Sequence, residues 1–269
     1  MTFRILSLVS ALVAALPATL MANPYEDNLT MRLLPGWRTA DGTHVAGLEL
    51  TLAPGWKTYW RAPGEAGVPP VFDWAGSGNL AAARISWPRP EVFDLNGLRS
   101  IGYHDRVVLP LVLTPRDAGQ PITLRGDVTL GICEEICVPL DLDLAGTLPA
   151  AAGRRDPAIA AALADRPYTA REARVGRVTC SVAPARNGMT LKVGIDMAAT
   201  GGTETMVIET SDPLVWASDS RTRRDGGRLT GETELVHAAG QPFALDRSGL
   251  TITVLGRDRA VEIKGCTGG

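Results

Sequence analysis

The sequence predicts an all-β protein of two β-sandwich domains joined by a short helical linker. Short runs of alternating apolar and polar residues recur along the chain. Turn residues separate these runs every 8–12 residues or so, and patterns with helical spacing are almost absent. The 29 glycines and 19 prolines suit a fold with many turns, and 269 residues are enough for two ordinary domains.

Residues 1–22 have the features of a secretory signal peptide. Arg4 supplies a positive n-region, residues 5–16 form the apolar stretch, and Ala22 is a suitable last residue before cleavage. An uncleaved membrane anchor is the alternative, but the apolar run is short and Pro17 interrupts it. We therefore expect an exported protein with no stable membrane insertion after signal cleavage.

The charge balance argues against a nucleic-acid partner. Twenty-seven Lys and Arg residues face 29 Asp and Glu residues, which gives a formal net charge of −2. Such a chain offers no broad basic surface to a phosphate backbone. We expect partners that are neither nucleic acid nor anionic lipid.

Residues 23–149 are expected to form the first domain. Alternation predicts strands at residues 30–34, 45–52 and 107–113, with another beginning at residues 85–87. Pro110 lies inside one of these runs, which predicts an edge strand or a bulge because proline cannot donate to a ladder. Residues 64–78 and 91–97 are expected to be loops, the latter carrying Phe93 and Leu95 as a buried plug or a mobile lid.

Residues 131–139, Gly-Ile-Cys-Glu-Glu-Ile-Cys-Val-Pro, are the most informative stretch. On a straight strand the Cα atoms of Cys133 and Cys137 would lie ~13 Å apart, whereas a disulfide needs about 4.4–6.8 Å. The chain must therefore fold back between them. Alternating apolar residues on both sides favour a hairpin with one sulfur at each strand end. A disulfide in so short a loop is expected to be accessible to redox partners.

The chain has four cysteines, and in an oxidising compartment we expect them to be paired. Proximity favours a Cys133–Cys137 pair, which leaves Cys180 and Cys266 for a structural bridge. A bridge closing so long a loop stabilises by roughly 4–5 kcal/mol on the chain-entropy model. The alternative is that Cys266, three residues from the C-terminus, is a mobile reactive thiol.

Residues 150–172 are expected to form the linker. Asp156 is suited to cap a helix that Pro157 opens, that runs to Ala164 and that Pro167 ends. Alternation then returns in residues 173–269, which predicts a second, smaller β-sandwich. Its expected strands are residues 178–182, 189–195, 206–208, 214–217, 229–236, 250–255 and 260–263.

Three runs, taken in order, resemble the N-terminal periplasmic domain of DsbD-type thiol:disulfide interchange proteins. They are residues 55–61 (GWKTYWR), 101–110 (IGYHDRVVLP) and 131–139. The likeness covers roughly residues 35–148 and is greatest to the branch with the ScsB-type copper-tolerance reductases. It implies an immunoglobulin-like sandwich whose cysteine pair cycles between disulfide and dithiol beneath a cap loop. The sequence departs from the best-known members, because three residues rather than five separate its cysteines. DsbD proteins also continue into a membrane conduit and a thioredoxin-like domain, which we expect to be missing here.

The resemblance also implies a set of site residues. The reactive pair would be Cys133 and Cys137, and the cap would comprise Phe93, Asp94, Leu95, Asn96 and Gly97. Tyr59, Trp60, Arg61, Tyr103, His104, Glu134 and Glu135 would lie near the sulfurs. Whether Phe93 or Leu95 shields them stays open, and Trp56, Tyr59 and Trp60 have ordinary packing as their alternative role.

Two acidic residues, Glu134 and Glu135, stand between the cysteines. Close to the sulfurs, their charge would raise the pKa of either thiol. Such a pair suits a disulfide that a partner's thiolate attacks, rather than an attacking nucleophile. The alternative is that both glutamates are solvated residues at a hairpin tip. His104 is a candidate for proton transfer, with a plain surface role as its alternative.

The leading functional hypothesis is an exported protein-disulfide reductase component. It would relay electrons, without a cofactor, from a thioredoxin-like or membrane thiol reductase to an oxidised periplasmic protein. Cytochrome c biogenesis or copper tolerance is the implied context. The alternative is a non-enzymatic two-domain adaptor, or a copper-binding chaperone with purely structural disulfides. Cys133, Cys137 and methionines are soft Cu(I) ligands, but the six methionines do not cluster. The three histidines match no zinc spacing, so no metal site is expected.

Overall fold

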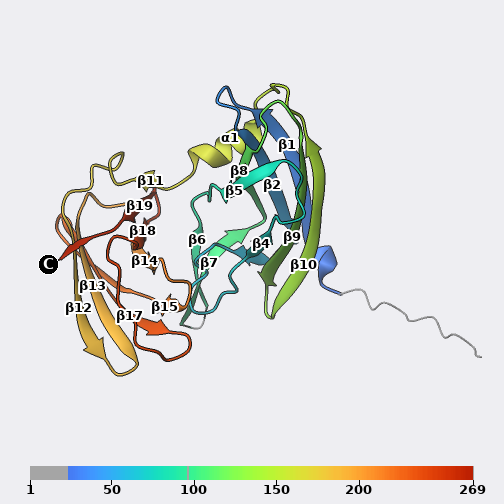
Figure 1. Ribbon diagram of the computed structural model, residues 1–269. Coiled ribbons are helices and arrows are strands. Elements are labelled where there is room, and N and C mark those ends of the chain that lie inside the picture. The colour runs from blue at the N-terminus through green and yellow to red at the C-terminus, as the bar shows by residue number, and fades with distance from the viewer. Residues whose placement is uncertain (1–23, 96, 269) are drawn as a thin grey trace, which may run out of the picture.

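The computed structural model describes residues 24–95 and 97–268, without the side chain of Leu95. The expected signal peptide and Asn96 lie outside the described residues. Two β-sandwich domains stand side by side, and one short helix lies in the segment between them (Figure 1). The all-β prediction, with two sandwich domains and a helical linker, is confirmed. None of the helices in the described part of the chain is long and apolar enough to cross a membrane.

The first domain pairs two antiparallel sheets, which we call sheets A and B. Sheet A has the order β1 (Leu29–Arg38), β2 (His44–Leu52), β8 (Arg106–Pro115), β5 (Leu80–Ile85). Sheet B has the order β10 (Cys137–Leu148), β9 (Ile122–Cys133), β3 (Lys57–Tyr59), β7 (Leu98–His104), β6 (Glu91–Leu95), and β4 (Val71–Asp73) also pairs with β9. A single 3₁₀ turn, η1 (Glu26–Asn28), precedes β1.

Strand β9 illustrates why the sheets form a sandwich. Ile122, Leu124 and Leu130 alternate with exposed or half-buried residues and are buried against the facing sheet. Period-two burial of this kind sends one face of a strand into the core and the other to its outside. Thr129, Gly131 and Cys133 therefore share the outer face of sheet B.

Some strand predictions for this domain were wrong. Residues 64–78 contain β4 and residues 91–97 contain β6, although both were expected to be loops. A strand was expected to begin at residues 85–87, whereas β5 ends at Ile85. Each of these short strands exists because a neighbouring strand offers a ladder, as β7 does for β6. The alternation of neighbouring residues in the sequence does not reveal such a partner strand.

Pro110 does not mark an edge strand. Strand β8 lies inside sheet A between β2 and β5, and Pro110 faces Gly47. The carbonyl of Pro110 accepts a hydrogen bond from the Ser86 N–H at 2.8 Å, one residue beyond the end of β5. In an antiparallel ladder the N–H and C=O of one residue point the same way. The missing donor thus falls where β5 has already ended, so the proline is tolerated.

Helix α1 (Pro157–Ala164) forms where the sequence predicted it. The Asp156 side chain accepts hydrogen bonds from the N–H groups of Ala158 and Ile159, as a helix N-cap does. Ile159 is fully buried, and its Cγ1 lies 2.8 Å from where a Cβ on Gly47 would be. The helix therefore packs closely on the outside of sheet A and ties the linker to the first domain.

The second domain is built from sheets C and D. Sheet C has the order β11 (Tyr168–Thr169), β19 (Ala260–Lys264), β18 (Thr251–Leu255), β14 (Thr205–Glu209). Sheet D has the order β15 (Val215–Ala217), β17 (Arg228–His237), β13 (Gly188–Asp196), β12 (Val178–Ala185), β20 (Thr267–Gly268). Strand β16 (Arg221–Asp225) also pairs with β17, and the sequence analysis missed it because three of its five residues are arginines. The buried Cys180 of β12 is bonded to Cys266.

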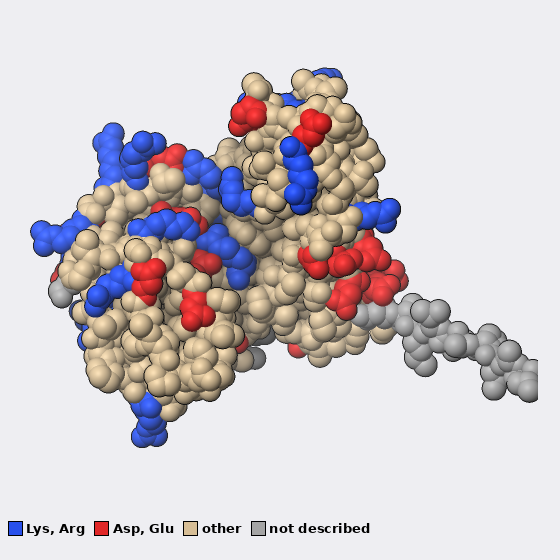
Figure 2. Space-filling view, viewed as in Figure 1, with Lys and Arg blue, Asp and Glu red and all other residues tan. Residues whose placement is uncertain are grey.

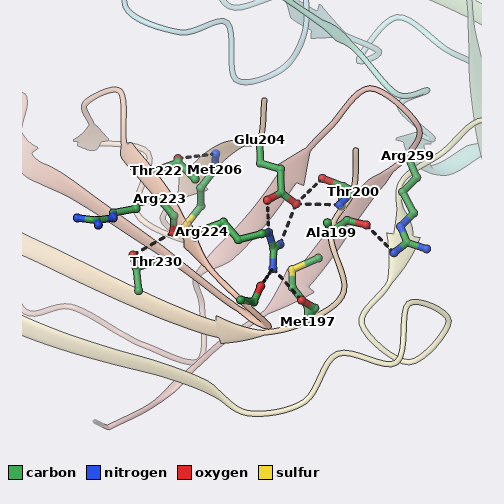
Figure 3. A network of polar contacts seen from close by, with 11 residues as sticks. Met197, Ala199, Thr200, Glu204, Met206, Thr222, Arg223, Arg224, Thr230 and Arg259 are labelled. Carbon is green, nitrogen blue, oxygen red and sulfur yellow. Dashed lines mark hydrogen bonds and ion pairs between the residues drawn. The ribbon is translucent and has the colours of Figure 1, made fainter. Parts of the chain in front are cut away.

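Arg224 carries a polar network that holds β16 in place (Figure 3). Its guanidinium donates to both carboxylate oxygens of Glu204 and to the Met197 carbonyl, the last at 2.9 Å. Glu204 also accepts from the N–H and hydroxyl of Thr200 at 2.8 and 2.9 Å. Burial raises the pKa of Glu204, but the bonds from Arg224 and Thr200 outweigh it and lower the pKa overall.

Arg61 joins the two domains. It donates to both oxygens of Glu209 at 2.8 and 2.9 Å and to Glu262 at 2.7 Å, and both carboxylates belong to sheet C. Its guanidinium also lies 4.3 Å from the centroid of the Trp60 ring. A cleft of about 500 Å³ opens beside this contact, lined by Arg99 and Trp216 among others. The second domain is thus fixed to the segment that follows β3.

Candidate functional site

The Cys133–Cys137 disulfide closes the end of the β9–β10 hairpin. The two cysteines are directly opposite each other, with Cα atoms 4.1 Å apart, and residues 134–136 form the tip. Directly opposed residues of an antiparallel pair have neighbouring Cβ atoms on one face. The sequence therefore brings both sulfurs together on the outer face of sheet B, at its end.

The two cysteines differ sharply in exposure. Cys133 is only 6% exposed, whereas Cys137 is exposed and follows Ile136, which is 51% exposed. Exchange requires a thiolate to approach one sulfur of the bridge. Cys137 is therefore the more accessible residue of the pair for an incoming thiolate, and Cys133 the less accessible one.

The side chain of Tyr59 contacts the exposed Cys137. Its hydroxyl oxygen lies 3.2 Å from Cys137 Sγ, although the residue is only 2% exposed. A Cβ on Gly131 would lie 2.9 Å from the Tyr59 ring and 2.7 Å from Val68, so the glycine leaves room for that ring. Burial raises the pKa of Tyr59, which keeps its proton available for donation to sulfur.

Lys57 is a site residue that the sequence analysis missed. It lies opposite Cys133 on one side of β3 and opposite His104 on the other. Its Nζ donates to Ser100 Oγ at 2.9 Å and lies 5.1 Å from the centroid of Phe93. Burial lowers the pKa of this ammonium. The available signal was its position two residues before Tyr59, which places both on the same face of one strand.

The segment expected to be the cap forms the β6–β7 hairpin. Phe93 pairs with Ser100, and its ring meets His104 edge-on with centroids 6.1 Å apart. Asp94 is bonded to Arg99 at 3.3 Å, and Gly97 has the positive φ of a tight turn. Leu95 pairs with Leu98 through its backbone, while its side chain and Asn96 lie outside the described residues. His104, Lys57 and Cys133 form one row across β7, β3 and β9, and the Phe93 ring contacts the first two of them.

Three of the residues expected near the sulfurs have other surroundings. Trp60 is fully buried in the core of the sandwich. Tyr103 is also in that core, where its hydroxyl donates to the Pro88 carbonyl at 2.9 Å and burial raises its pKa well above the usual value. Arg61 is bonded to the second domain. Successive side chains therefore have different roles: Tyr59 contacts Cys137, Trp60 packs in the core, and Arg61 contacts the second domain.

The glutamates of the hairpin tip have different surroundings. A Cβ on Gly55 would lie 2.9 Å from Glu134 Oε1, so that carboxylate lies over the turn before β3. Glu135 is exposed. His104 is half-exposed, with Nδ1 2.9 Å from Glu91 and Nε2 3.6 Å from Asp105. Across residues 24–95 and 97–268, no group of three or more potential ligands is arranged to hold a metal ion.

Comparisons with known proteins agree with this geometry. Residues 30–149 match the family described as "Thiol:disulfide interchange protein DsbD, N-terminal". The crystal structure of the N-terminal periplasmic domain of ScsB from Proteus mirabilis is similar over 92% of this chain and 96% of that one. The two share 25% sequence identity, with a TM-score of 0.68.

Other comparisons add less. The reduced N-terminal domain of Neisseria meningitidis DsbD is matched over 46% of this chain and 92% of that one. Its 18% identity and TM-score of 0.31 are too low to support a structural argument. A search of curated proteins gave no match. Residues 30–149 of this chain therefore match the family of DsbD N-terminal domains, and the fold of the chain is similar to that of the ScsB periplasmic domain.

Proposed function

We propose that this protein is a periplasmic relay that passes electrons through Cys133 and Cys137. The donor would be a thioredoxin-like or membrane thiol reductase, and the acceptor an oxidised periplasmic protein. The observation that carries the proposal is the pairing of an exposed Cys137 with a buried Cys133 at a hairpin end. The match of residues 30–149 to the DsbD N-terminal family supports thiol–disulfide exchange, and the likeness to the periplasmic domain of ScsB supports the compartment.

The proposed reaction is an ordinary exchange. A donor thiolate attacks Cys137 Sγ, the Cys133–Cys137 bond breaks, and Cys133 leaves with the electron pair as a thiolate. The donor's second thiolate then attacks the donor sulfur that is bonded to Cys137 in the mixed disulfide. This step releases Cys137 and leaves the donor oxidised by two electrons. The same steps in reverse deliver both electrons to an oxidised client.

The β6–β7 hairpin is the proposed shield of Cys133, the buried member of the pair. A dithiol in an oxidising compartment needs protection from unwanted acceptors. Phe93 already contacts Lys57 and His104, which belong to the same row across sheet B as Cys133. A partner would displace this ring when it docks at the hairpin tip.

Trapping of mixed disulfides tests the exchange reaction. Cys133→Ser leaves the exposed Cys137, which should form a mixed disulfide with a partner from periplasmic extract. A reducing agent should cleave this adduct. Cys137→Ser leaves only the buried Cys133 and should capture far less. The Cys133→Ser/Cys137→Ser double variant is the control. Equal capture by all three proteins would contradict the proposal.

The reduction potential of the pair separates a relay from a structural disulfide. We expect a value within the range of exchange proteins, about −120 to −270 mV, in a glutathione redox titration followed by alkylation. A value below about −300 mV would identify an inert staple and favour an adaptor role. The Cys180–Cys266 bridge, whose first sulfur is buried, serves as the internal reference.

A further inference from the structure

We propose that Lys57 stabilises the thiolate that forms on Cys133 when the disulfide opens, and so lowers the barrier to exchange. This inference rests on the proposed function and assigns a role within the same site. It concerns a residue that is opposite the leaving Cys133 in the sheet, rather than opposite the sulfur under attack.

The sheet register places Lys57 beside the leaving sulfur. Strand β3 runs between β9 and β7, and Lys57 is directly opposite Cys133. Residues so opposed have Cβ atoms about 4.5–5.5 Å apart on the same face. The four-carbon side chain of lysine is flexible, so a change of rotamer suffices to bring Nζ to the sulfur.

In the disulfide form the ammonium has only neutral partners. It donates to Ser100 Oγ and lies over the Phe93 ring, and within the described ranges no carboxylate forms an ion pair with it. Lys57 is partly buried and Ser100 is 3% exposed, so water compensates this charge poorly. A cation held without a counter-charge gains most when a negative charge appears next to it.

Reaction supplies that negative charge. When the donor sulfur bonds to Cys137, the electron pair of the broken bond stays on Cys133, which is 6% exposed. A buried thiolate is costly unless a cation or a hydrogen bond stabilises it. A leaving thiol of lower pKa departs faster. The Lys57 ammonium therefore acts on the transition state more than on the disulfide.

The other charged groups around this position are already engaged or face elsewhere. His104, which is opposite Lys57 on the adjacent strand β7, contacts Glu91 and Asp105. Glu134 follows Cys133 in the chain, but its carboxylate lies over the turn at Gly55. The Tyr59 hydroxyl lies at the other sulfur. Among the charged groups named here, Lys57 is thus the cation placed to stabilise a thiolate on Cys133.

The thiol pKa of Cys133 provides a direct test. It would be measured in full-length Cys137→Ser protein from the pH dependence of thiolate absorbance at 240 nm, with and without Lys57→Met. Methionine keeps the length of the side chain and its contact with Phe93 but removes the charge. We expect the pKa to rise by about one unit in Lys57→Met and to be restored in Lys57→Arg. A structural role alone would not produce this rescue.

Kinetics provide the second measurement. Reduction of the intact pair by dithiothreitol at pH 7 should slow about threefold in Lys57→Met and stay unchanged in Lys192→Met, a surface lysine of the second domain. Lys57→Gln replaces Lys57→Met if the latter does not fold. An unaltered Cys133 pKa in the charge-free variant would overturn the role of Lys57 and leave the relay intact. A pair that dithiothreitol cannot reduce in any variant would refute the proposed function instead.

Discussion

Tyr59 and Cys137 are 78 positions apart in the chain, yet the phenol oxygen of one lies 3.2 Å from the sulfur of the other. The contact exists because β3 pairs with β9, and β9 pairs with β10. It joins a buried hydrogen-bond donor to the exposed sulfur of the pair. Of the aromatic residues in the 55–61 run, Tyr59 is therefore the one placed to influence the chemistry of Cys137.

Replacing Tyr59 by phenylalanine should slow exchange without unfolding the domain. The variant keeps the ring beside Gly131 but loses the hydrogen bond to Cys137 Sγ, the sulfur that is released as a thiolate in the second step of reduction. Hydrogen bonds to charged groups contribute about 1.5–3 kcal/mol, so we expect the rate of reduction by dithiothreitol to fall about tenfold. Tyr168→Phe, which changes a half-exposed residue of the second domain, should leave the rate unchanged. Equal rates in Tyr59→Phe and the unmodified protein would remove the hydroxyl from the reaction.

Gly131→Ala should displace the Tyr59 ring. The new Cβ would lie 2.7 Å from Val68 and 2.9 Å from Tyr59, closer than packed carbon atoms allow. Forcing a group into a packed site costs about 1–3 kcal/mol, which urea denaturation would measure as a lower free energy of unfolding. Exchange should slow as well, since the ring carries the hydroxyl. Gly227→Ala meets no atom within 4 Å and is the matched control. Full stability of Gly131→Ala would argue against this packing.

Acid should weaken the second domain through Glu204. Its folded pKa is lowered, so its contribution to stability is fully present above the unfolded value of 4.5 and is lost as the pH falls through the folded pKa. We expect the urea midpoint of the second domain to fall as the pH drops below about 4.5. Glu204→Gln should be less stable at pH 7 but show a weaker pH dependence in this window. Glu234→Gln, which alters an exposed residue of β17, should retain the original profile. An identical profile in Glu204→Gln would assign the acid sensitivity to other groups.

Like charges face each other on the outer side of sheet B. Asp127 of β9 is directly opposite Asp143 of β10 and Asp73 of β4, and all three are exposed. A group of acidic side chains is also visible where η1 and β10 meet the surface (Figure 2). Directly opposed like charges destabilise a sheet by about 0.2–1 kcal/mol.

Asp143→Asn should therefore raise the free energy of unfolding by about 0.2–1 kcal/mol in 20 mM salt. The gain should shrink in 0.5 M salt, because salt screens exposed charges. Urea denaturation at both salt concentrations measures the difference. A gain that does not depend on salt would mean that side-chain packing, rather than charge, accounts for it.

Several parts of the fold and site were predictable because they depend on neighbours in the chain. The Cys133–Cys137 spacing forces the chain to turn, and the alternation on both sides selects a hairpin. Asp156 and Pro157 supply the start of α1 by themselves. The interior position of Pro110 was not predictable, because it depends on where β5 ends on the adjacent strand. Lys57 was missed for a similar reason, since its neighbours Cys133 and His104 belong to other strands.

By itself, the sequence determined that the chain forms strands of alternating apolar and polar residues. It also determined where helix α1 begins and that two cysteines four positions apart meet at a hairpin end. These features follow from the preferences of residues that are close along the chain. Only the tertiary structure decided which cysteine faces solvent, that Tyr59 lies at its sulfur, and that Arg61 reaches Glu262, 201 positions away. Alternation tells each strand which face to bury, but it does not specify the order of strands within a sheet. That order is set by the joint packing of the whole core, which assigns each side chain its neighbours.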